Sequence, residues 1–133
     1  MFSLLIGCNE SKTIPENTVV FNDNKTLPYQ EIISFYTQLA DSSPAISMQE
    51  VGSTDAGFPL HMIIYNDDSN FKFDELTREK AVVLINNGIH PGEPDGIDAS
   101  MKLFSDLASS TITPPKNTVI VCIPVYNIGG ALN

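Results

Sequence analysis

The sequence predicts an α/β fold: a mixed β-sheet that opens as a hairpin and continues as a parallel βαβ unit, with helices on its faces. Residues 46–51 alternate apolar and polar side chains, and a glycine-containing turn separates them from a second strand at 59–65, which indicates a β-hairpin. Residues 81–85 and 118–125 are nearly continuous apolar runs on either side of a segment with helical spacing. The order strand, helix, strand favours a parallel pair joined by a right-handed crossover.

Two amphipathic helices accompany these strands. The first is predicted over residues 27–40, where Pro28 suits a first helical turn. Its apolar face consists of Ile32, Ile33, Tyr36, Leu39 and Ala40. The second follows the acidic, proline-containing segment 93–95. Its predicted core face consists of Ile97, Met101, Phe104, Leu107 and Ala108.

The remaining segments carry weaker patterns. Residues 66–80 are expected to form a charged, polar connection that Phe71 and Phe73 pin to the body of the domain. Residues 81–85 lack polar alternation, which is typical of a strand covered on both faces.

Length and charge limit the possible functions. The chain has 133 residues, 42% hydrophobic and 17% charged, which suits one domain with a packed core. The formal net charge is −9, from 16 acidic and 7 basic residues. Nucleic acids and anionic membrane surfaces select for clustered Lys and Arg, so this composition argues against both as partners.

The two cysteines belong to different contexts. Cys122 lies within an apolar strand and is expected to be a small buried residue. Cys8 ends the apolar run 1–8, which resembles the lipobox of bacterial lipoproteins, although no basic segment precedes it. The alternative is an N-terminal strand with an incidental cysteine. The lipoprotein interpretation predicts a partial signal segment at 1–8, a polar tether at 9–26 and the folded domain at 27–133. It also predicts membrane attachment through a lipid on Cys8 and an extracytoplasmic location, in the bacterial periplasm or on the cell surface.

The turn after residues 81–85 holds the main candidate site. His90 and Glu93 are separated by two residues, and Gly92 lets the backbone bend between them. Catalytic zinc is bound by three protein ligands drawn from His and carboxylates, with water at the open position. A His-x-x-Glu pattern alone is a weak signal. Its position between a strand and a helix start strengthens it, because the helix dipole favours an ionised Glu93.

Other candidate residues have simpler explanations. His61 lies on a hairpin strand with Ile63 and Tyr65 on its own face, and is expected to be a partly buried, hydrogen-bonded histidine. Asp95 and Asp98 could orient His90 without binding the metal themselves, or could be solvent-facing acids of the first helical turn. Asn127 could border the site or cap a turn.

Three motifs together resemble the zinc metallocarboxypeptidases of the carboxypeptidase A type. The first metal motif of that family is similar to Asn87-Gly88-Ile89-His90-Pro91-Gly92-Glu93-Pro94. Its strand-end Asn-Pro-Asp-Gly turn is similar to residues 124–130, although Ile128 replaces the proline and Gly129 the aspartate. Its opening Gly-x-Ser hairpin is similar to residues 51–60. Order and spacing agree over roughly residues 28 to 133.

The resemblance implies that His90 and Glu93 are the first two zinc ligands of an enzyme that hydrolyses peptide bonds at the C-terminus of a peptide or protein. It also implies a third histidine ligand, a general-base glutamate and carboxylate-binding arginines, all expected beyond Asn133. The chain is therefore expected to be the N-terminal part of the catalytic domain and to be inactive alone. The alternatives are a zinc deacylase of the aspartoacylase or succinylglutamate desuccinylase type, and a non-catalytic, lipid-anchored fragment or binding module.

Overall fold

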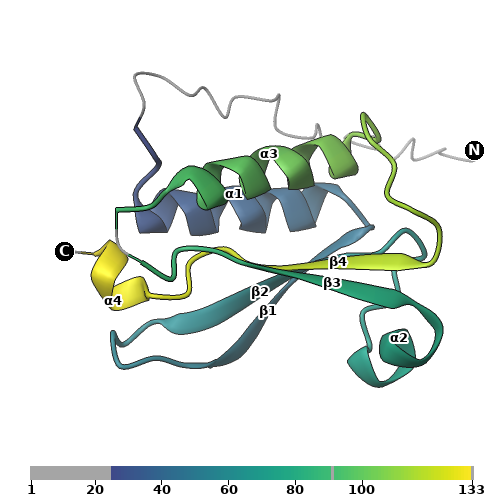
Figure 1. The fold of residues 1–133 in the computed structure, drawn as a ribbon, viewed down its shortest axis with the longest axis horizontal. Coiled ribbons are helices and arrows are strands. Elements are labelled where there is room, and N and C mark those ends of the chain that lie inside the picture. Colours follow the sequence, from purple (N-terminus) through teal and green to yellow (C-terminus); the bar gives the residue numbers. More distant parts are fainter. Residues whose placement is uncertain (1–24, 91, 133) are drawn as a thin grey trace, which may run out of the picture.

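The computed structural model describes residues 25–90 and 92–132. The elements in chain order are α1 (Tyr29–Ser42), β1 (Ile46–Ser53), β2 (Pro59–Tyr65), α2 (Phe73–Glu79), β3 (Ala81–Asn86), α3 (Asp95–Ala108), β4 (Thr118–Ile123) and α4 (Ile128–Ala131) (Figure 1). Within the described ranges, no helix combines the length and hydropathy needed to cross a membrane. Cys8, the signal segment and most of the expected tether lie outside the described residues.

The predicted fold class is confirmed. The sheet has four strands in the order β1-β2-β4-β3. β1 and β2 form the antiparallel hairpin, β2 pairs with β4 antiparallel, and β3 pairs with β4 parallel. The crossover between the parallel strands is α3, so the hairpin and the βαβ unit meet at the β2–β4 pairing.

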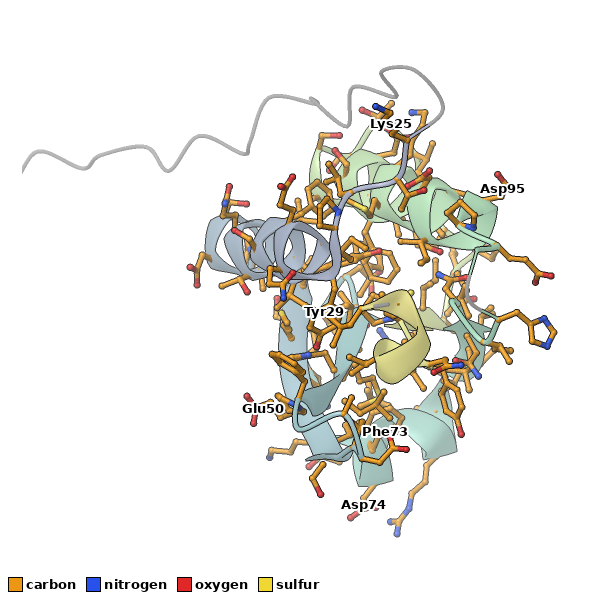
Figure 2. The ribbon with its side chains drawn as sticks, turned by 90° about the vertical axis from the view of Figure 1, so that its left-hand side faces the viewer. Lys25, Tyr29, Glu50, Phe73, Asp74 and Asp95 are labelled. Carbon is orange, nitrogen blue, oxygen red and sulfur yellow. The ribbon has the colours of Figure 1, made fainter. Side chains whose placement is uncertain are left out.

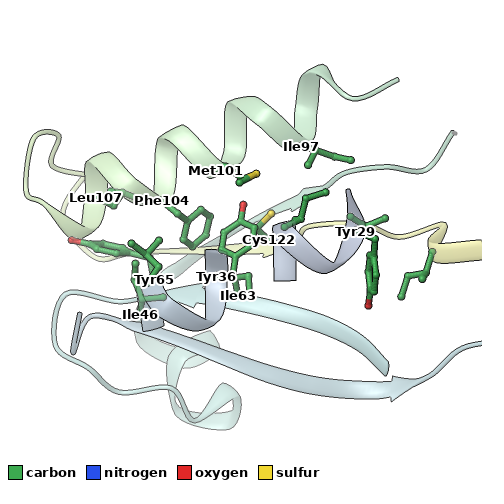
Figure 3. Packing of buried hydrophobic residues seen from close by; sticks show 14 residues of the cluster. Tyr29, Tyr36, Ile46, Ile63, Tyr65, Ile97, Met101, Phe104, Leu107 and Cys122 are labelled. Atoms are coloured by element: carbon green, nitrogen blue, oxygen red, sulfur yellow. The ribbon is translucent and has the colours of Figure 1, made fainter. Parts of the chain in front are cut away.

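The main core lies between the sheet and the two long helices, which run side by side over one face (Figure 1). Tyr36 of α1 and Phe104 of α3 are fully buried and meet edge to face, with ring centroids 5.8 Å apart. Ile63 and Cys122 rise from the sheet beneath them (Figure 3). The predicted helical core faces are confirmed for Ile32, Tyr36, Leu39, Ile97, Met101, Phe104 and Leu107.

The connection at 66–80 contains a helix, α2, which was not predicted from the sequence. Its acidic first turn, Asp74 and Glu75, and Arg78 in its last turn suit the helix dipole. Leu76 is buried against Ile64, and the two predicted pinning residues pack on the same small cluster. α2 therefore covers part of the second face of the sheet.

The expectation that residues 81–85 are covered on both faces is also wrong. β3 is an edge strand, and Val83 and Leu84 are 48% and 59% exposed. The apolar run reflects residues that could be buried. Ile85 packs against the main core, but Val82, Val83 and Leu84 remain exposed. A row of unpaired backbone groups adds to this exposure. The amides of Ala81 and Asn87 both donate toward β4. Because backbone groups alternate in direction along a strand, the N–H and C=O groups of residues 82, 84 and 86 face away from β4, at the open edge of the sheet.

The two edges of the sheet differ in their protection. Edge strands of soluble proteins are usually protected by charges, bulges or short length. β1, at the other edge, has Glu50 and a register shift between Glu50 and Gly52. β3 has six residues without a charge or an interruption of its pairing. We expect self-association of this chain to occur through β3.

Val83→Lys tests this expectation. A charge on β3 should reduce concentration-dependent association several-fold, because pairing a second strand there would bury it. Val51→Lys is the matched control, since Val51 is 46% exposed on β1 and the change in net charge is the same. Sedimentation velocity over a concentration series measures the effect. Equal behaviour of the two variants would contradict a specific role for β3.

Candidate metal centre

The two parallel strands end at the same place, as predicted for His90 and Asn127. Backbone bonds extend their pairing beyond both strands: the amide of Tyr126 donates to the Asn87 carbonyl at 2.8 Å, and that of Asn127 to the Gly88 carbonyl at 2.9 Å. Figure 2 looks at this end of the molecule, where α4 and the first turns of α1 and α3 gather; Tyr29 and Asp95 are labelled there. The metal turn, which carries His90 and Glu93, is therefore hydrogen-bonded directly to the strand-end turn at residues 124–130.

Glycines allow the chain to leave β3 in this direction. Gly88 and Gly92 have φ of +60° and +83°, a region that L-residues adopt at a cost. At Gly88 a Cβ would also lie 3.3 Å from the Val125 backbone, whereas the space at Gly92 is open. Gly88 thus serves close packing of the turn on the following strand, and Gly92 serves the reversal between His90 and Glu93.

His90 and Glu93 do converge. His90 Nδ1 lies 3.0 Å from Glu93 Oε2, and the side chains are 71% and 72% exposed. An exposed ion pair three residues apart contributes only about 0–1 kcal/mol to stability. The pair therefore adds little to the stability of the fold, and both side chains remain accessible from solvent.

The geometry fits two ligands of one zinc ion. Zinc bound at about 2.0–2.1 Å by nitrogen and oxygen in a tetrahedral arrangement separates two ligand atoms by about 3.3 Å. The observed 3.0 Å separation of His90 Nδ1 and Glu93 Oε2 is close to this value, so both atoms could bind one ion after a small adjustment. Among the residues that the structure describes, no group of three His, Cys, Asp or Glu could hold a metal. Within the described residues, the turn brings together two potential ligand atoms, His90 Nδ1 and Glu93 Oε2.

A pocket of about 160 Å³ adjoins the turn. Its lining is Thr26, Leu27, Tyr29, Ile32, Gly88, His90, Gly92, Glu93, Pro94, Ile97, Asn127 and Ala131. Sequence reasoning found the turn residues but missed Tyr29 and Thr26. Nothing in the local pattern marks these two residues, because it is the packing of α1 on α3 that brings them beside the turn.

Asp98 and Asn127, whose roles the sequence left open, each make definite hydrogen bonds. Asp98 accepts a hydrogen bond from Thr26 at 3.0 Å, which joins the segment before α1 to α3. The Asn127 side chain accepts from the Gly130 amide at 2.9 Å and so caps α4. Its amide group also reaches the Ile89 carbonyl at 3.5 Å. Asn127 therefore both caps a turn and borders the site.

His61 lies elsewhere, in a groove of about 320 Å³ formed with α1 and β1. It is opposite Glu50 on the hairpin. The expectation that it is hydrogen-bonded is wrong at Nδ1, which is buried and has no partner among the described residues. Burial lowers the pKa of His61 below its usual 6.5, and Glu50 opposes this in part.

Comparisons with known proteins agree on the fold. Carboxypeptidase A from Helicoverpa armigera matches over 82% of this chain and 26% of its own length, with a TM-score of 0.69 and 20% identity. Bovine thrombin-activatable fibrinolysis inhibitor, solved in complex with tick carboxypeptidase inhibitor, matches over 81% of this chain and 33% of its own, with a TM-score of 0.66 and 18% identity. Neither a protein-family model nor a curated protein matches the sequence. The chain thus shares the carboxypeptidase fold and spans about a quarter to a third of these structures.

Alanine at the two turn glycines should separate backbone strain from packing. Gly92→Ala carries the cost of positive φ alone, about 1–2 kcal/mol. Gly88→Ala should cost about 1–3 kcal/mol more, because the new methyl group meets the Val125 backbone. Urea denaturation of both variants measures the difference. A smaller loss at Gly88 than at Gly92 would show that the close approach to Val125 has no energetic weight.

The lowered pKa of His61 predicts a pH dependence of stability. The folded state binds the proton less readily than the unfolded state, so this stabilisation is full above about pH 6.5 and is lost as the pH falls through the folded pKa. His61→Gln should flatten the decline between pH 7.5 and about 5.5. His90→Gln, at the exposed histidine, is the control and should keep it. Denaturation midpoints across this range measure the effect, and an unchanged slope in His61→Gln would refute the assignment.

Proposed function

We propose that this chain is the N-terminal part of a zinc metallocarboxypeptidase, in which His90 and Glu93 are two of the ligands of the catalytic zinc. The observation that carries the proposal is the 3.0 Å approach of His90 Nδ1 to Glu93 Oε2 at the carboxyl end of a parallel strand. Ligands of open α/β sheets collect at that end of the strands. The carboxypeptidase fold of the chain supports the same assignment.

The chain's own residues would bind and orient the metal. His90 would offer Nδ1 and Glu93 a carboxylate oxygen, both from a turn whose backbone is bonded to Tyr126 and Asn127. When bound, zinc would supply an activated water and polarise the scissile carbonyl. A third histidine, a general-base glutamate and arginines for the terminal carboxylate are proposed to lie beyond Asn133. The proposed substrate is a peptide or protein C-terminus.

Zinc binding and peptide hydrolysis by the complete protein that contains this domain test the proposal. The expected result is one zinc per molecule and cleavage of peptides with a free C-terminus but not of their amidated forms. His90→Ala and Glu93→Gln should each lose the metal, with hydrolysis reduced by about 10³-fold or more. His61→Ala and Glu50→Gln are the matched controls and should retain both properties. Absence of stoichiometric zinc, or cleavage independent of His90, would reject the proposal.

The substrates chosen also separate the alternatives. Hydrolysis of N-acyl amino acids in preference to peptides would favour the deacylase. Zinc retained without hydrolysis of either class would favour a binding module. The 133-residue chain alone is predicted to bind zinc weakly, because two ligands leave the coordination incomplete. It is also predicted to show no turnover, and measurable zinc-dependent hydrolysis by this chain would contradict that prediction.

The location remains part of the proposal. Acylation of Cys8 would place the enzyme outside the cytoplasm, as a lipoprotein of the bacterial periplasm or cell surface. Mass spectrometry of the protein expressed with its native N-terminus tests this directly. A diacylglycerol adduct on Cys8 is expected, and an unmodified Met1 in the mature protein would reject it.

A further inference from the structure

We propose that Asn87 is the positioning residue of the metal turn, holding the backbone that carries His90 and Glu93 through a buried side-chain bond to α3. This inference rests on the proposed function for its consequence, but its structural content stands on contacts that involve no metal. Asn87 is 8% exposed and directly follows β3, whereas its neighbour Asn86 is exposed.

The Asn87 side chain bonds two other elements at once. Its Nδ2 donates to Ser100 Oγ of α3 at 2.7 Å and approaches Cys122 Sγ of β4 at 3.5 Å. Both acceptors are buried, and Tyr36 of α1 lies next to the same sulfur (Figure 3). Burial raises the pKa of Cys122 to about 11, so the thiol stays neutral and is suited to accept from an amide.

The residues around Asn87 are shaped to admit it. A Cβ at position 96 would lie 2.8 Å from Asn87 Oδ1, so the first turn of α3 approaches this close only because residue 96 is glycine. Asp at position 87 would keep the shape, and the Ser100 hydroxyl could turn to donate to it, but a charged carboxylate would then be buried where the amide is neutral, which is costly. Position 87 therefore favours a neutral amide.

The main chain of Asn87 transmits this restraint to the turn. Its amide donates to the Ile123 carbonyl at 3.0 Å and its carbonyl accepts from Tyr126 at 2.8 Å. His90 follows Asn87 by three positions, and the side chains of His90 and Glu93 are both exposed. Fixing Asn87 on α3 and β4 sets where the turn begins and so orients both metal-binding side chains. Removing a group that orients a metal ligand without itself binding the metal commonly lowers metal affinity about 10–100-fold.

The test compares Asn87→Asp and Ser100→Ala with Asn86→Asp, the same substitution one residue earlier on an exposed side chain. Zn²⁺ is titrated into the complete protein that contains this domain and followed by the NMR signals of His90. Amide hydrogen exchange of Tyr126 and Asn127, measured without metal, reports the docking of the turn. We expect both core variants to exchange these two amides at least about tenfold faster relative to β2 amides, and to weaken zinc binding about tenfold. Asn86→Asp should change neither.

Each outcome is decisive. Unchanged exchange and zinc affinity in a folded Asn87→Asp or Ser100→Ala chain would overturn the positioning role. If Asn87→Asp does not fold, Ser100→Ala decides, because it removes only one hydroxyl. A loss of global stability alone, with normal zinc affinity per folded molecule, would also overturn it. Absence of zinc from the complete wild-type protein would count against the proposed function, while the exchange of Tyr126 and Asn127 would still decide the role of Asn87.

Discussion

The parallel pairing of β3 with β4 is the constraint on which the rest of the site depends. It continues past both strands through Asn87 and Gly88, whose carbonyls accept from Tyr126 and Asn127. This pairing places the turn after β3 beside the turn after β4, and α3, the crossover between them, begins directly at the turn. Glycine at position 88 makes the junction possible for two reasons. It adopts a positive φ, and it has no side chain that would meet Val125.

The site combines a rigid base with exposed ligands. Asn87, Ser100 and Cys122 are buried beneath the turn, whereas His90 and Glu93 extend into solvent. Such a division is physically reasonable for a metal site, since ligand atoms must remain accessible while the backbone that carries them stays fixed. An exposed His–Glu pair contributes little to stability. The adjoining pocket adds apolar surface from α1, α3 and α4.

The exposed β3 edge follows from the same arrangement. β4 occupies the centre of the sheet and leaves β3 with one pairing partner. Its apolar side chains, Val83 and Leu84, remain accessible because the long helices lie over β2 and β4 and α2 covers only part of the opposite face. The solved structures with this fold are about three to four times longer than the portion matched here.

The sequence by itself determined the hairpin, the βαβ unit, the core faces of α1 and α3 and the His90–Glu93 turn, because side-chain periodicity and turn chemistry are local properties. Tertiary structure alone decided the exposure of β3, since periodicity indicates which residues could be buried but not whether a neighbour covers them. It likewise decided the formation of α2, whose buried residue Leu76 packs on the sheet. The burial of Asn87 and the approach of Tyr29 to the site belong to the same class. Both arise from contacts between elements far apart in the chain, which no local pattern encodes.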